Sequence, residues 1–294
     1  MTVADSFLVS VTRLFLSLSL SLTALFLPTG EVKANPLPPK ADGAAARAVT
    51  FNLRCTGLGK TSIAYRAPLL TAQLLATGAD SIGVQEANLR WMLYLREHLN
   101  GYESVGVSRG NGKNRGEFSA IFYQKEKYDL LDSGTFWLSK TPDVPGSSDW
   151  GSANIRICTW AILQNKETKQ TYAHFNTHLD HVSDNARTNQ IQVLLERMTQ
   201  IAGELPVILT GDFNAETDSD MYRAAARALQ DSRLTAAVTD DKGTFHSYGV
   251  IEPKLIDYIF VSESVSPLVY HVIDDKLNDA YLSDHYGIYL DFSY

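Results

Sequence analysis

The sequence predicts a fold of the α/β class, and two observations carry this prediction. Short runs of apolar or β-branched residues with no polar face, such as residues 207–210, are typical of strands that are covered on both sides. Between such runs lie segments with apolar residues at helical spacing, of which residues 185–202 form the clearest. Because ligands of α/β proteins collect where buried strands end, residues that follow a predicted strand are candidate site residues.

Composition and charge limit the possible functions. A chain of 294 residues with 45% hydrophobic residues is long enough for a large core in one or two domains. Its formal net charge of −7 argues against tight, non-specific binding to nucleic acid or to an anionic membrane. The two cysteines, Cys55 and Cys158, are too few for a metal-thiolate cluster. They either form a disulfide or stay as free thiols, and the sequence leaves both alternatives open.

The first 34 residues differ in kind from the rest. Arg13 precedes residues 14–27, an uncharged run rich in Leu and Ser that is shorter than the ~20 residues of a membrane-spanning helix. Val32-Lys33-Ala34 supplies small or compact residues at the two positions that a signal peptidase reads, which indicates cleavage after Ala34. Residues 1–34 are therefore expected to be a signal peptide. The protein is then exported, to the periplasm or the medium. An uncleaved N-terminal membrane anchor is the alternative.

Residues 35–46 are rich in Pro and Ala and are expected to be a linker, so the folded domain is expected at residues 47–294. Alternating polarity or short apolar runs predict the strands of its first half, at residues 48–54, 81–84, 102–107, 117–123 and 130–139. Helices are predicted at residues 66–76, where leucines recur at helical spacing before a Thr-Gly stop, and at residues 88–99. The long loop at residues 141–152, which follows the strand at 130–139, is expected to carry substrate contacts.

The second half of the domain shows the same two kinds of segment. Residues 156–163 and 171–178 are predicted to pair as strands around a turn. The amphipathic helix at residues 185–202 leads to the strand at 207–210, and a shorter helix is predicted at residues 221–229. The last predicted strands are at residues 257–261 and 287–292.

Polar residues follow the predicted strands at several places. Asn52 and Arg54 share one face at the end of the first strand, and Glu86 follows the second. Asp212 and Asn214 follow the strand at 207–210, where an extended backbone would point both the same way. Each has a structural alternative: an exposed edge strand for the first pair, a charge that favours the next helix for Glu86, and a turn cap for the last pair.

Histidines are unevenly distributed along the chain. His174, Asn176 and His178 share one face of a predicted strand, and Asp180 and His181 lie just beyond it. A cluster of this kind could bind zinc or perform acid-base chemistry. His174 by itself is expected to be packed or on the surface.

Six motifs in order carry a resemblance to a known family. They are Thr50-Phe-Asn52, Val84-Gln-Glu86, Asn176-Thr-His178, Gly211-Asp-Phe-Asn214, Ile256-Asp257-Tyr and Ser283-Asp-His285. With them the chain resembles the endonuclease/exonuclease/phosphatase superfamily over residues 48–292. Four further segments resemble a bacterial, mostly exported subfamily of poorly defined substrates, namely residues 116–123, 136–139, 156–161 and 175–181. The resemblance implies a DNase I-like four-layer sandwich, in which two packed mixed β-sheets are flanked by helices and the site lies at one edge.

The resemblance also implies roles for single residues. Glu86 would be the principal metal ligand, with Asn52 and Asp284 nearby. Asp212 and Asn214 would position the attacking water and the phosphate. The remaining catalytic residues would be His285, its partner Asp257, and His178 with Glu117 as its acidic partner.

Three further residues are expected to contact the substrate, namely Arg54, Asn176 and Arg156. Residues 55–60 depart from the family pattern, which has an aromatic-Asp continuation after the first strand, so the contacts of this loop are not predicted.

Phosphate-ester hydrolysis agrees with the residue types present. Hard oxygen ligands such as Glu86, Asp284 and Asn52 suit Mg²⁺ or Mn²⁺. The first hypothesis is a divalent-metal phosphodiesterase in which water attacks phosphorus in line, and the second is a phosphomonoesterase for inositol or sugar phosphates. A catalytically silent exported binding protein is the alternative from another class. A monomer with a phosphate-ester substrate and no protein partner is expected.

Overall fold

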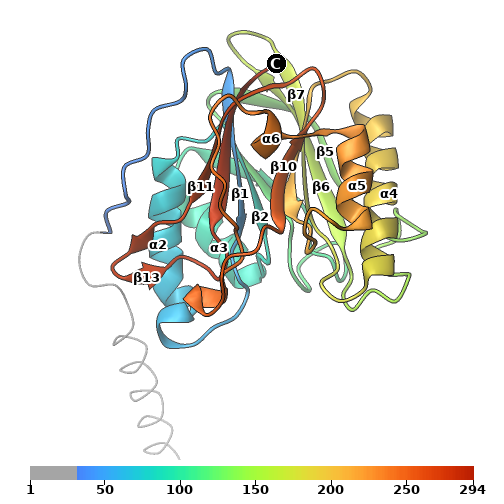
Figure 1. Cartoon of the computed structure of the whole chain (residues 1–294), viewed down its shortest axis with the longest axis horizontal. Coiled ribbons are helices and arrows are strands. Elements are labelled where there is room, and N and C mark those ends of the chain that lie inside the picture. The colour runs from blue at the N-terminus through green and yellow to red at the C-terminus, as the bar shows by residue number, and fades with distance from the viewer. Residues whose placement is uncertain (1–31) are drawn as a thin grey trace, which may run out of the picture.

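The computed structural model describes residues 32–294, and these residues form four layers in the order helices, sheet, sheet, helices (Figure 1). The first sheet has six strands, in the order β11 (Ser266–Ile273), β14 (Gly287–Ser293), β1 (Ala46–Asn52), β2 (Ser81–Gln85), β4 (Ile121–Gln124) and β3 (Tyr102–Val105). Its only parallel pair is β1 with β2. The sheet is therefore mixed, as expected.

The second sheet also has six strands, in the order β5 (Tyr128–Trp137), β6 (Ile157–Asn165), β7 (Thr171–His178), β8 (Val207–Asp212), β10 (Asp257–Val261) and β9 (Gln230–Asp231). In it, β7 and β8 are parallel and the other pairs are antiparallel. A separate hairpin joins β12 (Lys276–Leu277) to β13 (Ala280–Tyr281). The predicted sandwich of two mixed sheets is confirmed.

Helices cover the outer face of each sheet. In Figure 1, α2 (Ile63–Ala76) and α3 (Leu89–His98) lie on the first sheet, and α4 (Asp184–Ala202) and α5 (Asp220–Ala228) lie on the second. The short elements are α6 (Ser232–Thr235), η1 (Gly59–Thr61) and η2 (Ser247–Gly249). Each long helix begins at a cap residue whose side chain accepts a backbone N–H of the first turn, namely Ser62, Asn88, Ser183 and Ser219. No helix in residues 32–294 is long and apolar enough to cross a bilayer.

Three apolar clusters hold the layers together. Trp91 belongs to the cluster under α2 and α3, Phe213 to the cluster under α4 and α5, and Ile259 to the cluster between the two sheets. β1 and β8 are buried along their whole length because each lies in the middle of its sheet with packed layers on both faces. This burial is the physical reason that residues 207–210 of β8 have no polar face in the sequence.

The sheets approach one another closely beneath the strand ends. A Cβ atom at Gly83 of β2 would lie 2.4 Å from Thr210 Oγ1 of β8 and 2.6 Å from Asn176 Oδ1 of β7. Only glycine permits this approach. The carboxyl ends of β1 and β2 are thereby brought next to those of β7 and β8.

The segment that was expected to be a linker is packed onto the domain. Lys40 Nζ lies 2.5 Å from Asp80 Oδ2, Ala41 donates its N–H to Asp291, and the Pro38 carbonyl accepts a hydrogen bond from Arg47. These polar contacts, together with Leu37, which packs on the cluster under α2 and α3, hold the segment on the domain. Of the predicted signal peptide, residues 1–31 lie outside the described residues.

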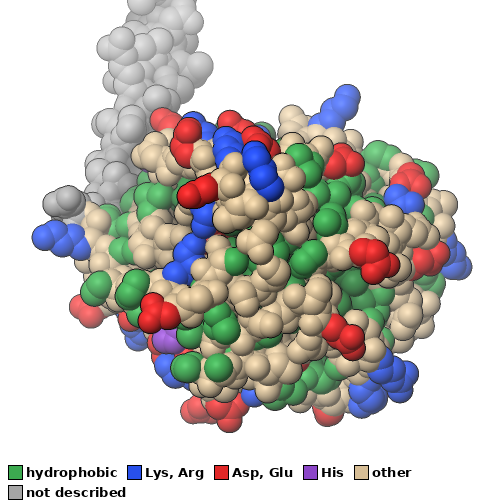
Figure 2. All heavy atoms as spheres, turned by 90° about the horizontal axis from the view of Figure 1, so that it is seen from above, with side chains coloured by type: hydrophobic (Ala, Val, Ile, Leu, Met, Phe, Trp, Pro, Cys, Tyr) green, Lys and Arg blue, Asp and Glu red, His purple; other side chains and the backbone are tan. Residues whose placement is uncertain are grey.

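The surface carries charges of both signs. Figure 2 shows acidic and basic side chains interspersed among apolar and neutral atoms on the face that it presents. This mixture agrees with the expectation that long polyanions are not attracted without specificity.

Candidate active site

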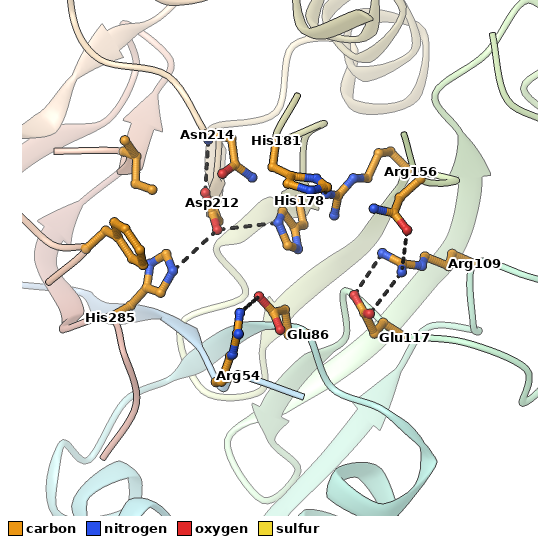
Figure 3. Close-up of a pocket in the computed structure, with 13 residues that line it drawn as sticks. Arg54, Glu86, Arg109, Glu117, Arg156, His178, His181, Asp212, Asn214 and His285 are labelled. Carbon is orange, nitrogen blue, oxygen red and sulfur yellow. Dashed lines mark hydrogen bonds and ion pairs between the residues drawn. The ribbon is translucent and has the colours of Figure 1, made fainter. Parts of the chain in front are cut away.

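Strand ends of both sheets enclose one cavity of about 310 Å³ (Figure 3). The cavity is lined by Arg54, Glu86, Arg109, Glu117, Asn154, Arg156, His178, His181, Asp212, Asn214, Phe245, Ile256 and His285. Eight of the twelve residues predicted from the sequence are among them, and three more lie in contact with the lining.

Strand register places three predicted residues in a row across the second sheet. Asp212 of β8 pairs with His178 of the parallel strand β7 and with Asp257 of the antiparallel strand β10. The first sheet contributes Asn52, the last residue of β1, whose register partner Gln85 ends β2 immediately before Glu86. The site therefore exists only where both sheets end together.

Three lining residues have a left-handed backbone, with φ of 55° at Arg54, 54° at Glu86 and 50° at Asn214. Such conformations are strained for residues other than glycine and cluster at functional sites. The same local contact supports two of them, because the Asn52 and Asp212 side chains each accept the N–H two residues ahead. These turns change the direction of the chain directly after β1 and β8.

Asp212 lies at the centre of the cavity's polar groups. Its Oδ2 accepts a hydrogen bond from Asn52 Nδ2 at 2.8 Å and lies 3.4 Å from His178 Nε2 and 3.8 Å from His285 Nε2. Burial, together with the nearby charge of Asp257, raises the pKa of Asp212 to about 7. A carboxylate with this pKa can accept and release a proton at neutral pH.

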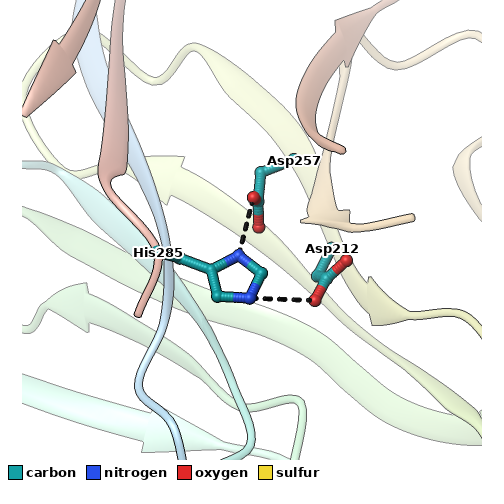
Figure 4. Close-up of side chains that lie close together, drawn as sticks. All are labelled: Asp212, Asp257 and His285. Atoms are coloured by element: carbon teal, nitrogen blue, oxygen red, sulfur yellow. Dashed lines mark hydrogen bonds and ion pairs between the residues drawn. The ribbon is translucent and has the colours of Figure 1, made fainter. Parts of the chain in front are cut away.

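His285 is held between two carboxylates (Figure 4). Its Nδ1 lies 2.9 Å from Asp257 Oδ2, an oxygen that also accepts a hydrogen bond from Thr244 Oγ1. Burial alone would lower the pKa of His285, but Asp257 and Asp212 raise it to about 10. His285 is therefore a cation at neutral pH, and the predicted pairing with Asp257 is present.

His178 is in the opposite state. Burial and the nearby cations Arg156 and Arg109 hold its pKa well below the usual range, so the imidazole is neutral. The predicted pairing of His178 with Glu117 was wrong. Glu117 forms a two-point ion pair with Arg109, at 2.8 and 2.9 Å, because Arg109 reaches it from the preceding loop.

The predicted metal ligands converge on one place. Arg54 contacts both Asp284 and Glu86, with Nε 3.4 Å from Asp284 Oδ2 and Nη1 3.9 Å from Glu86 Oε1. Asn52 Nδ2 lies 3.3 Å from Glu86 Oε1. Burial would raise the pKa of Glu86, but the Cys55 backbone N–H and Arg54 lower it, so the group is an anion. The two carboxylates are hard oxygen donors and fit Mg²⁺ or Mn²⁺. Asn52 would have to turn its amide to act as a ligand, because its oxygen accepts the Arg54 N–H and its nitrogen faces Glu86.

A second group has ligand atoms close enough for a metal, namely Asp212, Asp257 and His285, which lie within 4.8 Å of one another. We favour Glu86 and Asp284 because Asp257 Oδ2 in the second group already accepts hydrogen bonds from His285 and Thr244.

Arg156 is the buried cation of the cavity. One guanidinium nitrogen, Nη2, lies 3.3 Å from His181 Nδ1, while Nε and Nη1 have no hydrogen-bond partner. Burial and the proximity of Arg109 lower its pKa to about 10, so it remains charged at neutral pH. Unpaired donors of this kind are costly to bury, which is typical of a group kept for a ligand.

Asn176 does not reach the cavity, so its prediction as a substrate contact was wrong. Its Nδ2 donates to the carbonyls of Val84 and Ala120, and its Oδ1 accepts from Gln85 and Thr210. All four bonds are buried and cross between the sheets, so the side chain has a structural role.

The other polar residues near the predicted histidine cluster are also structural. His174 is buried between Ser81 and Thr210, as expected, and burial lowers its pKa to about 3. Asp180 accepts hydrogen bonds from backbone N–H groups of the loops on either side of it. The possible zinc cluster is therefore dispersed. Cys55 and Cys158 are both free thiols.

Five lining residues were not among the predicted site residues, namely Arg109, Asn154, His181, Phe245 and Ile256. Arg109 and Asn154 come from loops and are joined by a hydrogen bond of 3.2 Å. Phe245 packs on His285, with ring centroids 4.9 Å apart. The signals in the sequence were indirect: the long loop at residues 141–152, close to Asn154, was expected to carry substrate contacts, His181 is in the predicted histidine cluster, and Ile256 is in one of the six motifs.

Residues 49–285 match the Endonuclease/Exonuclease/phosphatase family. The chain belongs to this family. Among solved structures, an endonuclease/exonuclease/phosphatase from Bacteroides vulgatus is 34% identical, with a TM-score of 0.81, and the match covers 84% of this chain and 98% of that one. A mannosyl-6-phosphatase from Bacteroides thetaiotaomicron is 31% identical, with a TM-score of 0.80, over 85% of this chain and all (100%) of that one.

The curated relatives are more distant. Tyrosyl-DNA phosphodiesterase 2 of Bos taurus is 23% identical over 173 residues, which are 59% of this chain and 43% of the relative. The chain spans about a third to a half of the length of the first curated relatives that it matches, with 35%, 43% and 36% covered. A phosphatase and a phosphodiesterase are thus among the proteins similar to this member of the family, which supports phosphoester hydrolysis as its reaction class.

Proposed function

We propose that the protein is a divalent-metal-dependent phosphatase that hydrolyses small phosphate monoesters of the sugar-phosphate type. The observation that carries the proposal is Arg156, a buried cation in a small cavity that takes part in no ion pair among the described residues. A phosphate oxygen would supply the missing partner.

The balance of charge in the cavity favours a dianion. Arg109 is paired with Glu117, and His285 with Asp257. Arg54 is the counter-ion of Glu86 and Asp284, and a divalent cation bound to these carboxylates would replace it in that role. Arg54 and Arg156 would then both be without an anion, which matches the double charge of a monoester better than the single charge of a diester.

Size and similarity point the same way. A cavity of about 310 Å³ is at the lower end of the range for small-molecule sites. The mannosyl-6-phosphatase is similar to this chain over its whole length, whereas tyrosyl-DNA phosphodiesterase 2 is similar over less than half of its own. The acidic chain, at −7, also disfavours a long polyanionic substrate.

The residues of the cavity supply the steps that the hydrolysis needs. Asp212, with a pKa of about 7, takes the proton of the attacking water, while Asn214 helps to position that water. Arg156 binds phosphate oxygens and stabilises the charge that develops on them. His285, a cation held by Asp257, donates a proton to the leaving alkoxide as the P–O bond breaks, and Asp212, 3.8 Å from its Nε2, can return the proton taken from water. Glu86, Asn52 and Asp284 would hold Mg²⁺ or Mn²⁺, which supplies Lewis acidity toward the phosphate.

Phosphodiester hydrolysis, the first hypothesis from the sequence, is the second candidate. The likeness to tyrosyl-DNA phosphodiesterase 2 favours it. The same groups would serve a diester, because the site handles the phosphoryl group and the surrounding loops select the rest of the substrate.

A substrate panel separates the candidates. Purified residues 35–294 are assayed with mannose 6-phosphate, an inositol phosphate, p-nitrophenyl phosphate, its bis-p-nitrophenyl diester, plasmid DNA and sphingomyelin, with Mg²⁺ or Mn²⁺ and with EDTA. We expect metal-dependent hydrolysis of monoesters, with kcat/KM at least about tenfold above the diester, which is the factor expected from one unpaired charge–phosphate contact. Turnover of diesters alone would establish the second candidate. No turnover with any metal would indicate a binding protein.

We also propose that the protein is exported after cleavage near Ala34. The uncharged run at residues 14–27 supports this proposal. Intact-mass analysis of protein from a bacterial periplasm or medium should give a chain that begins at Asn35. A cell-associated chain that still begins at Met1 would instead establish the uncleaved anchor.

A further inference from the structure

We infer that Arg54 is a built-in counter-cation that competes with the divalent metal for Glu86 and Asp284 and that contacts the phosphate once the metal has replaced it. Metal binding and phosphate binding would then be coupled through one side chain. This inference rests on the proposed function: its first step requires the metal at Glu86 and Asp284 but no substrate, and its second step requires phosphate binding.

The contacts of the Arg54 side chain are loose. Its nitrogens lie 3.4 Å from Asp284 and 3.9 Å from Glu86, which are ion-pair distances longer than hydrogen bonds. The side chain is 43% exposed, whereas those of Glu86 and Asp284 are 12% and 6% exposed. The carboxylates are thus fixed in the wall of the cavity, and the guanidinium that neutralises them borders open solvent.

The backbone of Arg54, in contrast, is held on both sides. Its N–H donates to Asn52 Oδ1 at 3.0 Å. Its carbonyl accepts from Arg66 Nη2 at 2.8 Å and from Trp91 Nε1 at 3.1 Å. Arg66 and Trp91 are fully buried, so the left-handed turn at Arg54 is fixed by the core. The backbone of Arg54 is therefore fixed, and only its side chain can change position.

For electrostatic reasons, Arg54 and a divalent metal ion cannot both neutralise Glu86 and Asp284 at the same time. Two buried carboxylates side by side repel one another and need a nearby positive charge. A divalent ion satisfies both with twice the charge and with direct oxygen ligation, and it repels a guanidinium at the same place. Because Arg54 lines the cavity, its displaced guanidinium remains next to the space for the phosphate, whose oxygens it can bind with two parallel hydrogen bonds (Figure 3).

The test measures Mn²⁺ binding directly, by calorimetry or by the EPR signal of free Mn²⁺, with no substrate turnover. Wild type is compared with R54Q and with R223Q, which removes an exposed arginine that is paired with Asp220 on the surface of α5. Each protein is titrated with and without inorganic phosphate as the probe. Thermal melting without metal is recorded for all three.

Without phosphate, R54Q should bind Mn²⁺ about three- to tenfold more tightly than wild type and should melt at a lower temperature when no metal is added, while R223Q should match wild type in Mn²⁺ affinity. With phosphate, Mn²⁺ binding should tighten in wild type and R223Q, and this gain should be reduced at least threefold in R54Q. Equal or weaker Mn²⁺ binding by R54Q would overturn the competition. Tighter binding by R54Q with an undiminished phosphate gain would overturn the second step.

Failure of the proposed function gives a different result. In that case phosphate would not affect Mn²⁺ binding in wild type, while the difference between R54Q and wild type without phosphate would remain.

Discussion

The buried Arg156 lowers the stability of the folded protein but supplies a cation to the cavity. Two of its guanidinium nitrogens are buried without a hydrogen-bond partner, which is unfavourable in the folded protein. Replacing a buried, incompletely paired charge by an apolar residue of similar volume is often neutral or stabilising. Function would explain why the charge is present, because a phosphate oxygen can complete its hydrogen bonds.

We therefore expect R156M to raise the free energy of unfolding by about 1 to 3 kcal/mol and to lower kcat/KM for a phosphate monoester by about 10- to 100-fold. Urea denaturation and steady-state kinetics measure the two effects. R109M is the matched control, and it should be destabilised because it leaves Glu117 without its partner. A destabilised R156M with unchanged kinetics would mean that Arg156 is structural.

The buried His174 should contribute to the pH dependence of the free energy of unfolding. Its pKa is about 3 in the folded protein and 6.5 in the reference state, because burial disfavours the charged ring. Between these values the unfolded chain binds a proton that the folded chain does not, so stability is lost as the pH falls from 6.5 toward 3. The largest contribution of this one group is about 4 to 5 kcal/mol.

The non-titrating variant H174Q tests this effect. Between pH 6.5 and pH 4, the free energy of unfolding of wild type should fall more steeply than that of H174Q. The difference in slope should correspond to at most about one additional proton taken up on unfolding, and urea denaturation at each pH measures it. Parallel pH curves for the two proteins would show that His174 does not carry the effect.

In β7, the sequence pattern predicts which residues share a face but not which of them reach the cavity. Period-two alternation correctly placed His174, Asn176 and His178 on one face, but that face is covered by the first sheet along most of its length. Only the last of the three reaches the cavity. Which positions on a buried face reach a site depends on the partner sheet, and that information is not local.

We expect N176A to lower the free energy of unfolding by about 2 to 4 kcal/mol, because four buried hydrogen bonds between the sheets are lost, with KM changed less than about twofold. Chemical denaturation and kinetics report the two quantities. N189A, on the exposed face of α4, should be within about 0.5 kcal/mol of wild type. A raised KM with stability unchanged would restore Asn176 as a substrate contact.

β11 is an element that was not predicted, and its composition explains the omission. Pro267 is its second residue, and the register shifts between Pro267 and Val269. A proline within an apolar run argues against a strand, but β11 is at the edge of the first sheet, where a missing N–H is tolerated. Local rules cannot distinguish an edge from a loop.

For the whole molecule, the sequence located the buried strands and their polar ends one by one. The side-by-side arrangement of these ends in a sandwich was implied only by family resemblance, because the pairing of two sheets depends on contacts distant in sequence. Loop residues such as Arg109 and Phe245 have no periodicity, so nothing local placed them at the cavity. Folding of both sheets is thus required before any of the predicted chemistry can occur.

The most direct test of the account is phosphate release by D212N. Asp212 joins residues of both sheets at the centre of the cavity, and its proposed role is to take the proton of the attacking water. With Mn²⁺ and mannose 6-phosphate or p-nitrophenyl phosphate, the wild type should release phosphate, and D212N should be slower by about 10²- to 10⁴-fold. Its urea midpoint should be unchanged or higher, because a buried carboxylate that is repelled by Asp257 has been neutralised. A D212N protein within about threefold of wild-type turnover would contradict the account, since none of the steps assigned to this cavity could then depend on its central carboxylate.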